Sequence, residues 1–513
     1  MRKQGILMPI SSLPSAYGIG TFGRESYAFV DFLKAAGQRL WQILPLGPTG
    51  YGASPYQSFS TFAGNPYFID LELLVQDGYL TKKECDAVDF GSDPQEVDYG
   101  KLYSGRFPLL RKAWERAVRA GLETKAAYVE FIKENAFWLD DYAMFMALKD
   151  AFPGTGLLDW EEDLRLRKPL TMAKYQRQLA DEIKCYKFQQ YVFQKQWTQL
   201  KLYANRAGIE IIGDIPIYVS MDSADVWAHP ELFLLDESGS PIGVAGCPPD
   251  AFSETGQLWG NPLYRWEFHK ITNYNWWYQR INHCYNLYDI VRLDHFRGFD
   301  EYWFVPYGDK TAAGGHWEKG PGAEMFEILT RKMADKSNKG TGRRGKLADK
   351  KVIAEDLGFM TEGVFRLLAE TGYPGMKVLQ FAFDEGPDGE GLYLPHNYTK
   401  NCVVYTGTHD NETTLGWIRG RSAKQNAFLK EYLNADGETE LLWEMIRAAV
   451  SSVADTAVIP MQDYLELGNE ARMNFPSTMG ANWKWRMTPG AATKKLAERI
   501  YRLTRTYGRL QEN

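Results

Sequence analysis

Eight short runs rich in apolar and β-branched residues recur along the chain, and helix-compatible segments separate most of them. This alternation predicts an α/β fold, a (β/α)8 TIM barrel, in which each of eight parallel strands is followed by a helix. The length of 513 residues fits one such barrel with inserted elements. The predicted strands are residues 5–10, 39–46, 209–219, 290–293, 351–356, 376–383, 401–410 and 457–463.

Two long stretches interrupt this alternation. Residues 81–205 carry charged and apolar residues at three- and four-residue spacing, which predicts an inserted, mainly helical subdomain. Residues 220–265 alternate turn signals with short strand-like pieces, which predicts a smaller lid subdomain over the barrel mouth. We therefore expect residues 1–80 to begin the barrel and residues 206–513 to complete it, as a single catalytic domain.

Charge and cysteine usage exclude several classes of partner. A net charge of −6 argues against nucleic acid, which would call for a basic face. The five cysteines are scattered without a Cys-X-X-Cys spacing, which is typical of reduced thiols in a cytosol and predicts no metal site. Pro9 and Pro14 interrupt the first apolar run, and no run is long enough for a membrane helix. We expect a cytoplasmic protein with no membrane partner.

Acidic residues follow five of the predicted strands where each apolar run ends. In (β/α)8 barrels the catalytic groups lie at these C-terminal strand ends, so the five acids are candidate active-site residues. Each could instead cap a turn or the next helix, and for Asp214 and Asp384 this alternative stays open. Arg292 and His409 lie close in sequence to two of the acids and can balance their charge. The five are Asp214, Asp294, Glu355, Asp384 and Asp410.

Paired acids without a metal-ligand pattern indicate acetal chemistry at a sugar, in which one carboxylate attacks the anomeric carbon and another acid protonates the departing oxygen. We assign Asp294 as the nucleophile, because Arg292 shares its strand face and favours the ionised form. Glu355 follows two apolar residues and is assigned as the general acid/base. Asp410 is the third carboxylate, expected to hold sugar hydroxyls and stabilise the oxocarbenium-like transition state. The aromatic share of 14% suits a groove that stacks against sugar rings.

Eight longer motifs cover the chain from about residue 5 to residue 486. They are GASPYQSFSTFAGNPYFIDL at 52–71, IIGDIPIYV at 211–219, PPDAFSETGQLWGNPLY at 248–264, VRLDHFRG at 291–298, IAEDLG at 353–358, PGMKVLQFAFD at 374–384, YTGTHDNET at 405–413 and NWKWR at 482–486. In these motifs the chain resembles the 4-α-glucanotransferases of glycoside hydrolase family 77, known as amylomaltases or disproportionating enzymes, which are related to the α-amylases.

This resemblance implies an enzyme that moves α-1,4-glucan segments. The donor would be a malto-oligosaccharide, starch or glycogen, and the acceptor the 4-hydroxyl of a glucan or glucose. The implied reaction is a retaining double displacement through a covalent glycosyl-enzyme, with neither a cofactor nor a metal required. Asp294 resembles the family's nucleophile, Glu355 its acid/base and Asp410 its transition-state-stabilising carboxylate.

The same resemblance implies the substrate contacts. Arg292 and His409 fall on family positions that contact the nucleophile and the bound sugar, whereas Tyr56 and Trp259 fall on aromatic positions along the glucan groove. A structural ion pair for Arg292 and simple loop packing for both aromatics are the alternatives. The role of Asp384 stays open, because Glu385 follows it where some members have a second Asp. The expected substrate-binding residues are Tyr56, Asp214, Trp259, Arg292, His409 and Asp384.

Two other functions compete with glucan transfer. An α-amylase-like hydrolase would use the same acids, whereas a non-catalytic glucan-binding barrel would need neither a nucleophile nor a proton donor. Residues 246–262 could favour an acceptor sugar over water as a partial lid. In that segment prolines and glycines set turns, while Phe252, Leu258 and Trp259 supply apolar cover.

Overall fold

Eight short parallel strands pair side by side in the order β10-β11-β12-β1-β2-β3-β6-β9. The two ends of this order meet where the Ala354 N–H of β9 donates to the carbonyl oxygen of Pro374, just before β10, at 3.0 Å. The predicted (β/α)8 barrel is thereby confirmed. The strands are β1 (Lys3–Leu7), β2 (Leu40–Gln42), β3 (Glu210–Ile215), β6 (Ile290–Leu293), β9 (Lys351–Ala354), β10 (Gly375–Val378), β11 (Cys402–Tyr405) and β12 (Thr456–Pro460).

This computed structural model describes residues 2–50, 52–249, 253–337, 351–358, 360–383, 391–476, 478 and 480–510. Several of its strands end earlier than the apolar runs predicted. The run after β10 continues as a 3-10 helix, Leu379–Phe383, and β12 gives way to the short helix α17, Met461–Tyr464. A continuous apolar run does not distinguish a buried strand from a buried helix, which explains the difference.

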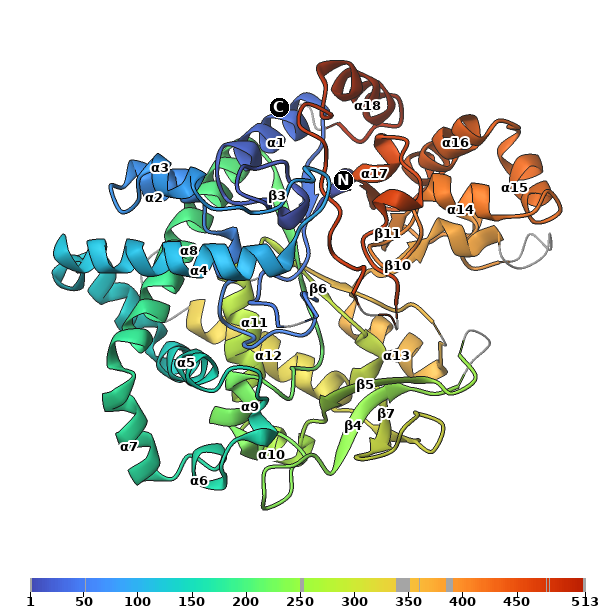
Figure 1. The fold of residues 1–513 in the computed structure, drawn as a ribbon. Helices are drawn as coiled ribbons and strands as arrows, with labels where there is room; N and C mark the ends of the chain where they lie inside the picture. The colour runs from blue at the N-terminus through green and yellow to red at the C-terminus, as the bar shows by residue number, and fades with distance from the viewer. Residues whose placement is uncertain are drawn as a thin grey trace.

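Helices surround the barrel, with the long helices α4, α5 and α8 on one side and α14, α15 and α16 on the other (Figure 1). The helices are α1 (Arg24–Ala35), α2 (Leu71–Gln76), α3 (Lys82–Asp86), α4 (Tyr99–Arg119), α5 (Ala126–Ala151), α6 (Glu162–Arg165), α7 (Pro169–Gln178), α8 (Ala180–Arg206), α9 (Ala224–Ala228), α10 (Trp266–Ile271), α11 (Asn275–Leu287), α12 (Gly322–Ser337), α13 (Glu362–Thr371), α14 (Thr414–Gly420), α15 (Gln425–Leu433), α16 (Glu438–Ser451), α17 (Met461–Tyr464) and α18 (Lys494–Thr506).

The helices between β2 and β3 also fix the long loop that follows β2. On α8, the buried Gln190 side chain accepts a hydrogen bond from Gly64 N–H at 2.7 Å and donates one to the Gly64 carbonyl oxygen at 2.8 Å. The Gln196 side chain of the same helix bonds the backbone of Asp70 in the same way, at 2.7 and 3.2 Å. Because loop backbone must have partners when it is buried, these two glutamines hold the loop against the barrel.

A second sheet of four antiparallel strands lies beside the barrel, in the order β5-β4-β7-β8 (Figure 1). The sequence predicted strand-like pieces within residues 220–265, where the structure has β4 (Gly243–Cys247) and β5 (Gln257–Pro262). The other two strands, β7 (Glu301–Pro306) and β8 (His316–Lys319), were not predicted. They follow the nucleophile candidate directly in the chain, so this sheet joins the predicted lid segment to the barrel rim.

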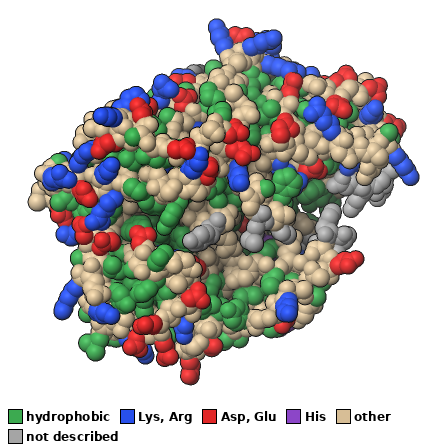
Figure 2. All heavy atoms as spheres, viewed as in Figure 1, with side chains coloured by type: hydrophobic (Ala, Val, Ile, Leu, Met, Phe, Trp, Pro, Cys, Tyr) green, Lys and Arg blue, Asp and Glu red, His purple; other side chains and the backbone are tan. Residues whose placement is uncertain are grey.

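The helices, the cysteines and the surface charges also bear on the predictions about membrane and nucleic-acid partners. Within the described ranges, no helix combines the length and the apolar character needed to cross a bilayer. The five cysteines form no disulfide. On the face shown in Figure 2, basic and acidic side chains are interspersed, and the surface is hollowed near its middle.

Candidate active site

Asp294 and Glu355 emerge side by side at the C-terminal ends of two neighbouring strands. Asp294 N–H donates to the Ile215 carbonyl oxygen at 3.0 Å, and Glu355 N–H donates to the Leu293 carbonyl oxygen at 3.0 Å. The barrel ladder therefore continues one residue beyond β6 and β9, and it carries both acids onto the same rim. The structure brings together the two residues that the sequence assigned as nucleophile and acid/base.

Arg292 supports the rim from inside the barrel, where its side chain is 3% exposed. Its Nη1 donates to both carboxylate oxygens of Asp214, at 2.8 and 2.6 Å, and to Oδ1 of Asp294 at 3.0 Å. The Asp214 side chain has no exposed surface. A charge buried this deeply must be paired, so Asp214 takes most of the guanidinium's charge and Asp294 receives a single contact. Asp214 therefore holds Arg292 in place, and its predicted contact with a sugar stays a prediction.

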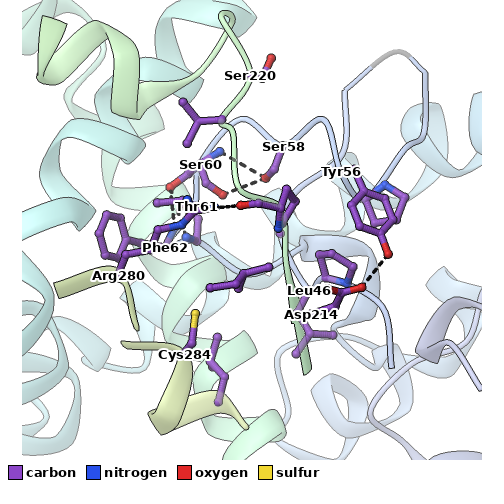
Figure 3. A pocket seen from close by; sticks show the side chains of 18 of the residues that line it. Leu46, Tyr56, Ser58, Ser60, Thr61, Phe62, Asp214, Ser220, Arg280 and Cys284 are labelled. Atoms are coloured by element: carbon purple, nitrogen blue, oxygen red, sulfur yellow. Dashed lines mark hydrogen bonds between the residues drawn. The ribbon is translucent and has the colours of Figure 1, made fainter. Parts of the chain in front are cut away.

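Tyr56 joins Asp214 to His409. Its hydroxyl donates to Asp214 Oδ2 at 2.7 Å (Figure 3) and lies 2.8 Å from His409 Nε2. Because the single phenolic proton goes to Asp214, the His409 Nε2 must donate to the tyrosine oxygen and therefore carries a proton. Burial lowers the pKa of His409, which favours the neutral ring. The two rings stack, with centroids 5.2 Å apart and planes 11° from parallel.

Asp410 lies on the loop after β11, and its side chain is 45% exposed. One carboxylate oxygen is 3.3 Å from His409 Nε2, and the other accepts a hydrogen bond from Asn474 Nδ2 at 2.7 Å. Arg472 donates to the Asp410 carbonyl oxygen at 2.9 Å. The carboxylate is thus held from two sides and open on the third, as a group that meets a ligand must be.

Both carboxyl oxygens of Glu355 accept backbone hydrogen bonds, one from His295 N–H at 2.7 Å and one from Leu357 N–H at 3.0 Å. His295 has a φ of 47°, a left-handed conformation that is uncommon for a residue other than glycine and often marks a functional site. The half-buried Trp259 of β5 meets the His295 ring edge to face, with centroids 4.8 Å apart. Trp259 therefore packs on the residue whose backbone N–H binds Glu355.

Burial dominates the protonation of both acids. It raises the pKa of Asp294 well above its ordinary value; the Arg292 charge opposes this rise and the neighbouring carboxylates add to it. Burial also raises the pKa of Glu355, against the opposing effects of Arg292 and the two backbone N–H bonds. Two acids this close titrate as a pair, and over a range of pH one is ionised while the other keeps its proton.

Tyr56 and Asp214 also line a cavity of about 50 Å³ on the inner side of the rim (Figure 3). This volume can hold water but is far below the several hundred Å³ of a typical ligand pocket. The Asp294 side chain is 26% exposed, so a ligand can reach it from solvent.

Comparison with known proteins agrees with this geometry. A family model described as 4-alpha-glucanotransferase matches residues 8–493. The chain belongs to this family. It is 49% identical to the 4-alpha-glucanotransferase of Clostridium butyricum, over 98% of this chain and 100% of that protein. It is 46% identical to the 4-alpha-glucanotransferase of Thermus thermophilus, over 99% of both chains.

Among solved structures, the chain is similar to an amylomaltase from Streptococcus agalactiae in complex with acarbose. The TM-score is 0.93 at 42% identity, and the alignment covers 100% of both chains.

Some predicted residues of this 4-alpha-glucanotransferase family member fall elsewhere. Asp384 and Phe252 lie outside the described residues. In the described ranges, no group of three or more His, Cys, Asp or Glu side chains could hold a metal ion. Sequence reasoning missed Arg472 and Asn474, because they follow no strand end, and it missed His295, because the functional atom there is a backbone N–H.

The buried Arg292–Asp214 pair generates a stability prediction. Asp214→Asn leaves the guanidinium buried with one carboxylate contact, so we expect the free energy of unfolding to fall by about 3 to 5 kcal/mol. Urea-induced unfolding followed by tryptophan fluorescence measures this change. Glu438→Gln is the control: it breaks the Arg419–Glu438 pair, whose side chains are 52% and 56% exposed, and should cost less than about 1 kcal/mol. Equal costs for the two variants would contradict the role given to Asp214.

Proposed function

We propose that this 4-α-glucanotransferase moves α-1,4-glucan segments from one malto-oligosaccharide or glucan to the 4-hydroxyl of another, by a retaining double displacement. The observation that carries the mechanism is the placement of Asp294 and Glu355 on adjacent strand ends, joined through the His295 N–H that bonds Glu355 at 2.7 Å. Acids on one rim can flank the same glycosidic bond; retention further requires the two carboxyl groups to lie about 5 to 5.5 Å apart, so that Asp294 can bond the anomeric carbon directly.

In the first step a carboxylate oxygen of Asp294 bonds to the anomeric carbon of the donor. The bond from that carbon to the glycosidic oxygen breaks, and Glu355 gives its proton to the departing oxygen. In the second step the ionised Glu355 takes the proton from the acceptor 4-hydroxyl. The acceptor oxygen then displaces Asp294 from the anomeric carbon, which restores both acids and the original configuration.

We assign the negative charge to Asp294 and the proton to Glu355. Arg292 donates a hydrogen bond to Asp294 Oδ1 at 3.0 Å, and hydrogen bonding to the charged form favours ionisation. Burial raises the pKa of both acids, and the guanidinium opposes this rise by a direct bond to Asp294 but by none to Glu355 among the described contacts. One charge and one proton are the starting state that the first step requires.

Asp410 and His409 are assigned to the transition state. The carboxylate of Asp410 is open on one side and can hold the sugar hydroxyls while positive charge develops at the anomeric carbon. The proton on His409 Nε2 is shared between Tyr56, at 2.8 Å, and Asp410, at 3.3 Å, and so helps to orient the Asp410 carboxylate. Tyr56 flanks this part of the rim, and Trp259 flanks Glu355, so a glucan chain crossing the rim would meet one aromatic ring at each end.

Transfer exceeds hydrolysis only if an acceptor sugar reaches the glycosyl-enzyme before water does. Strand β5, in the predicted lid segment, supports this because it carries Trp259 to His295, whose backbone N–H binds the acid/base. A ring that packs against an acceptor glucose there would orient the 4-hydroxyl and exclude water.

A cytoplasmic location of the protein stays a prediction.

The first test is incubation of the enzyme with maltotriose, followed by chain-length profiling and a reducing-end assay. We expect glucose and longer malto-oligosaccharides with a constant number of reducing ends, because transfer breaks and forms one bond each. A rising number of reducing ends would indicate a hydrolase. Asp294→Asn should lower the rate by at least about 10³-fold. Asp289→Asn, at the opposite end of β6, should retain transfer.

The protonation of Glu355 makes a second prediction. Maltotriose transfer should fall as pH rises through the pKa of Glu355, because only the protonated acid can release the leaving oxygen. With α-maltosyl fluoride the first step should lack this fall, since fluoride leaves without a proton. Glu355→Gln should therefore lose about 10²- to 10⁴-fold with maltotriose but retain a burst of fluoride release.

Asp356→Asn is the matched control for that experiment. Asp356 is the neighbouring carboxyl, buried and bonded to Met376 N–H at 2.6 Å. Its replacement should change the rates with both donors to a similar degree. If Glu355→Gln lost activity equally with maltotriose and with α-maltosyl fluoride, the assignment of Glu355 as the group that protonates the leaving oxygen would be contradicted.

A further inference from the structure

A fully buried carboxylate outside the catalytic set lies below the loop that carries Asp410. Asp463 belongs to α17, directly after β12, and it is 1% exposed. Its Oδ2 accepts hydrogen bonds from Thr406 Oγ1 at 2.6 Å and Thr414 Oγ1 at 2.7 Å. Its Oδ1 accepts a third from Thr414 N–H at 2.8 Å. With this exposure Asp463 cannot touch a substrate.

The two threonines are the two ends of one loop. Thr406 follows β11, and Thr414 begins α14, and the residues between them include His409 and Asp410 (Figure 1 labels β11, α14 and α17 close together). A single carboxylate therefore joins the start and the end of the segment that carries two of the proposed active-site groups. Three hydrogen bonds to the two oxygens of this carboxylate therefore anchor both ends of the loop to a third element.

Contacts within the loop pass this constraint on to Asp410. The Asn411 side-chain oxygen accepts from both N–H and Oγ1 of Thr408, each at 2.8 Å. Thr408 Oγ1 in turn accepts from Asp410 N–H at 3.3 Å. Gln380 donates to the Glu412 carbonyl oxygen at 2.9 Å. A loop bonded internally in this way moves as a unit, so displacing its ends displaces Asp410.

Among the described residues, the anchor contains no cation. In the part of the chain that the structure describes, Asp463 has no basic side chain within ion-pair distance, and its charge is compensated by hydroxyl and amide donors alone. Charge-assisted hydrogen bonds are short and strongly directional. A fixed, directional acceptor defines the position of both threonines more tightly than apolar packing does.

We propose that Asp463 is a positioning residue for the transfer reaction, which holds Thr406 and Thr414 so that Asp410 and His409 are correctly placed relative to Asp294. The proposal rests on the function proposed above, because it gives Asp463 its effect through Asp410. The role resembles that of a clamp on both ends of a loop, where a misplacement of about 1 Å can cost about 10²-fold in rate.

The test removes one of the two threonine hydroxyls that bond Asp463, by a substitution with valine, which has nearly the same shape as threonine. Thr406→Val and, separately, Thr414→Val should lower kcat for maltotriose disproportionation by about 10- to 100-fold, with a smaller change in KM. Thr406→Ser keeps the hydroxyl and should stay within about threefold of the wild type. Thr504→Val removes a hydroxyl equally buried in α18, bonded to the Ile500 carbonyl oxygen at 2.9 Å, and should leave kcat unchanged. Circular dichroism and melting temperature identify any variant that fails to fold.

A double-mutant comparison separates positioning from stability. If Thr406 acts through Asp410, adding Thr406→Val to Asp410→Asn should cost little further activity, because the group being positioned is already gone. A fully multiplicative loss would overturn the proposal, as would wild-type kcat in both valine variants. Failure of the wild type itself to disproportionate maltotriose would instead contradict the proposed function.

Discussion

The site depends on one buried cation shared between two carboxylates. Arg292 lies inside the barrel, and removing a guanidinium from water is tolerated only if fixed opposite charges replace the solvent. Asp214 supplies most of that replacement, with both oxygens bonded, and the remaining contact goes to Asp294. The nucleophile candidate is therefore oriented by a group that is itself immobilised, and the Arg292 charge opposes the rise in its pKa that burial causes.

Hydrogen bonds connect the other side chains of the site, one after another, to the Arg292–Asp214 pair. Tyr56 links Asp214 to His409, and His409 in turn reaches Asp410. Glu355 does not belong to this series of hydrogen-bonded side chains; two backbone N–H groups hold it instead. The separation has a chemical consequence, because the acid that must keep its proton is the one without a direct contact to the guanidinium. Environment, not residue type, gives four nearby carboxyls different tasks.

The sequence was sufficient to predict those parts of the fold that depend on residues close together in the chain. Apolar runs located the eight strands, and the positions of Asp294 and Glu355 after two of these runs predicted that both lie at strand ends on one rim. Contacts between distant segments could not be read from spacing. Asn474 bonds Asp410 across 64 residues, and Arg292 bonds Asp214 across 78. The apolar run at 379–383 proved helical, since burial on all sides removes the periodicity that separates strand from helix.

The central claim is that Asp294 becomes covalently bonded to the donor sugar, and trapping that bond tests it most directly. A fluorinated α-glucosyl fluoride, whose glycosyl-enzyme breaks down slowly, should label the protein with one glycosyl group. Peptide mass spectrometry should place this group on the peptide that contains Asp294 and fragment to an adduct on that residue. An adduct on Asp410 or Asp214, or products of inverted configuration with no adduct, would contradict the account.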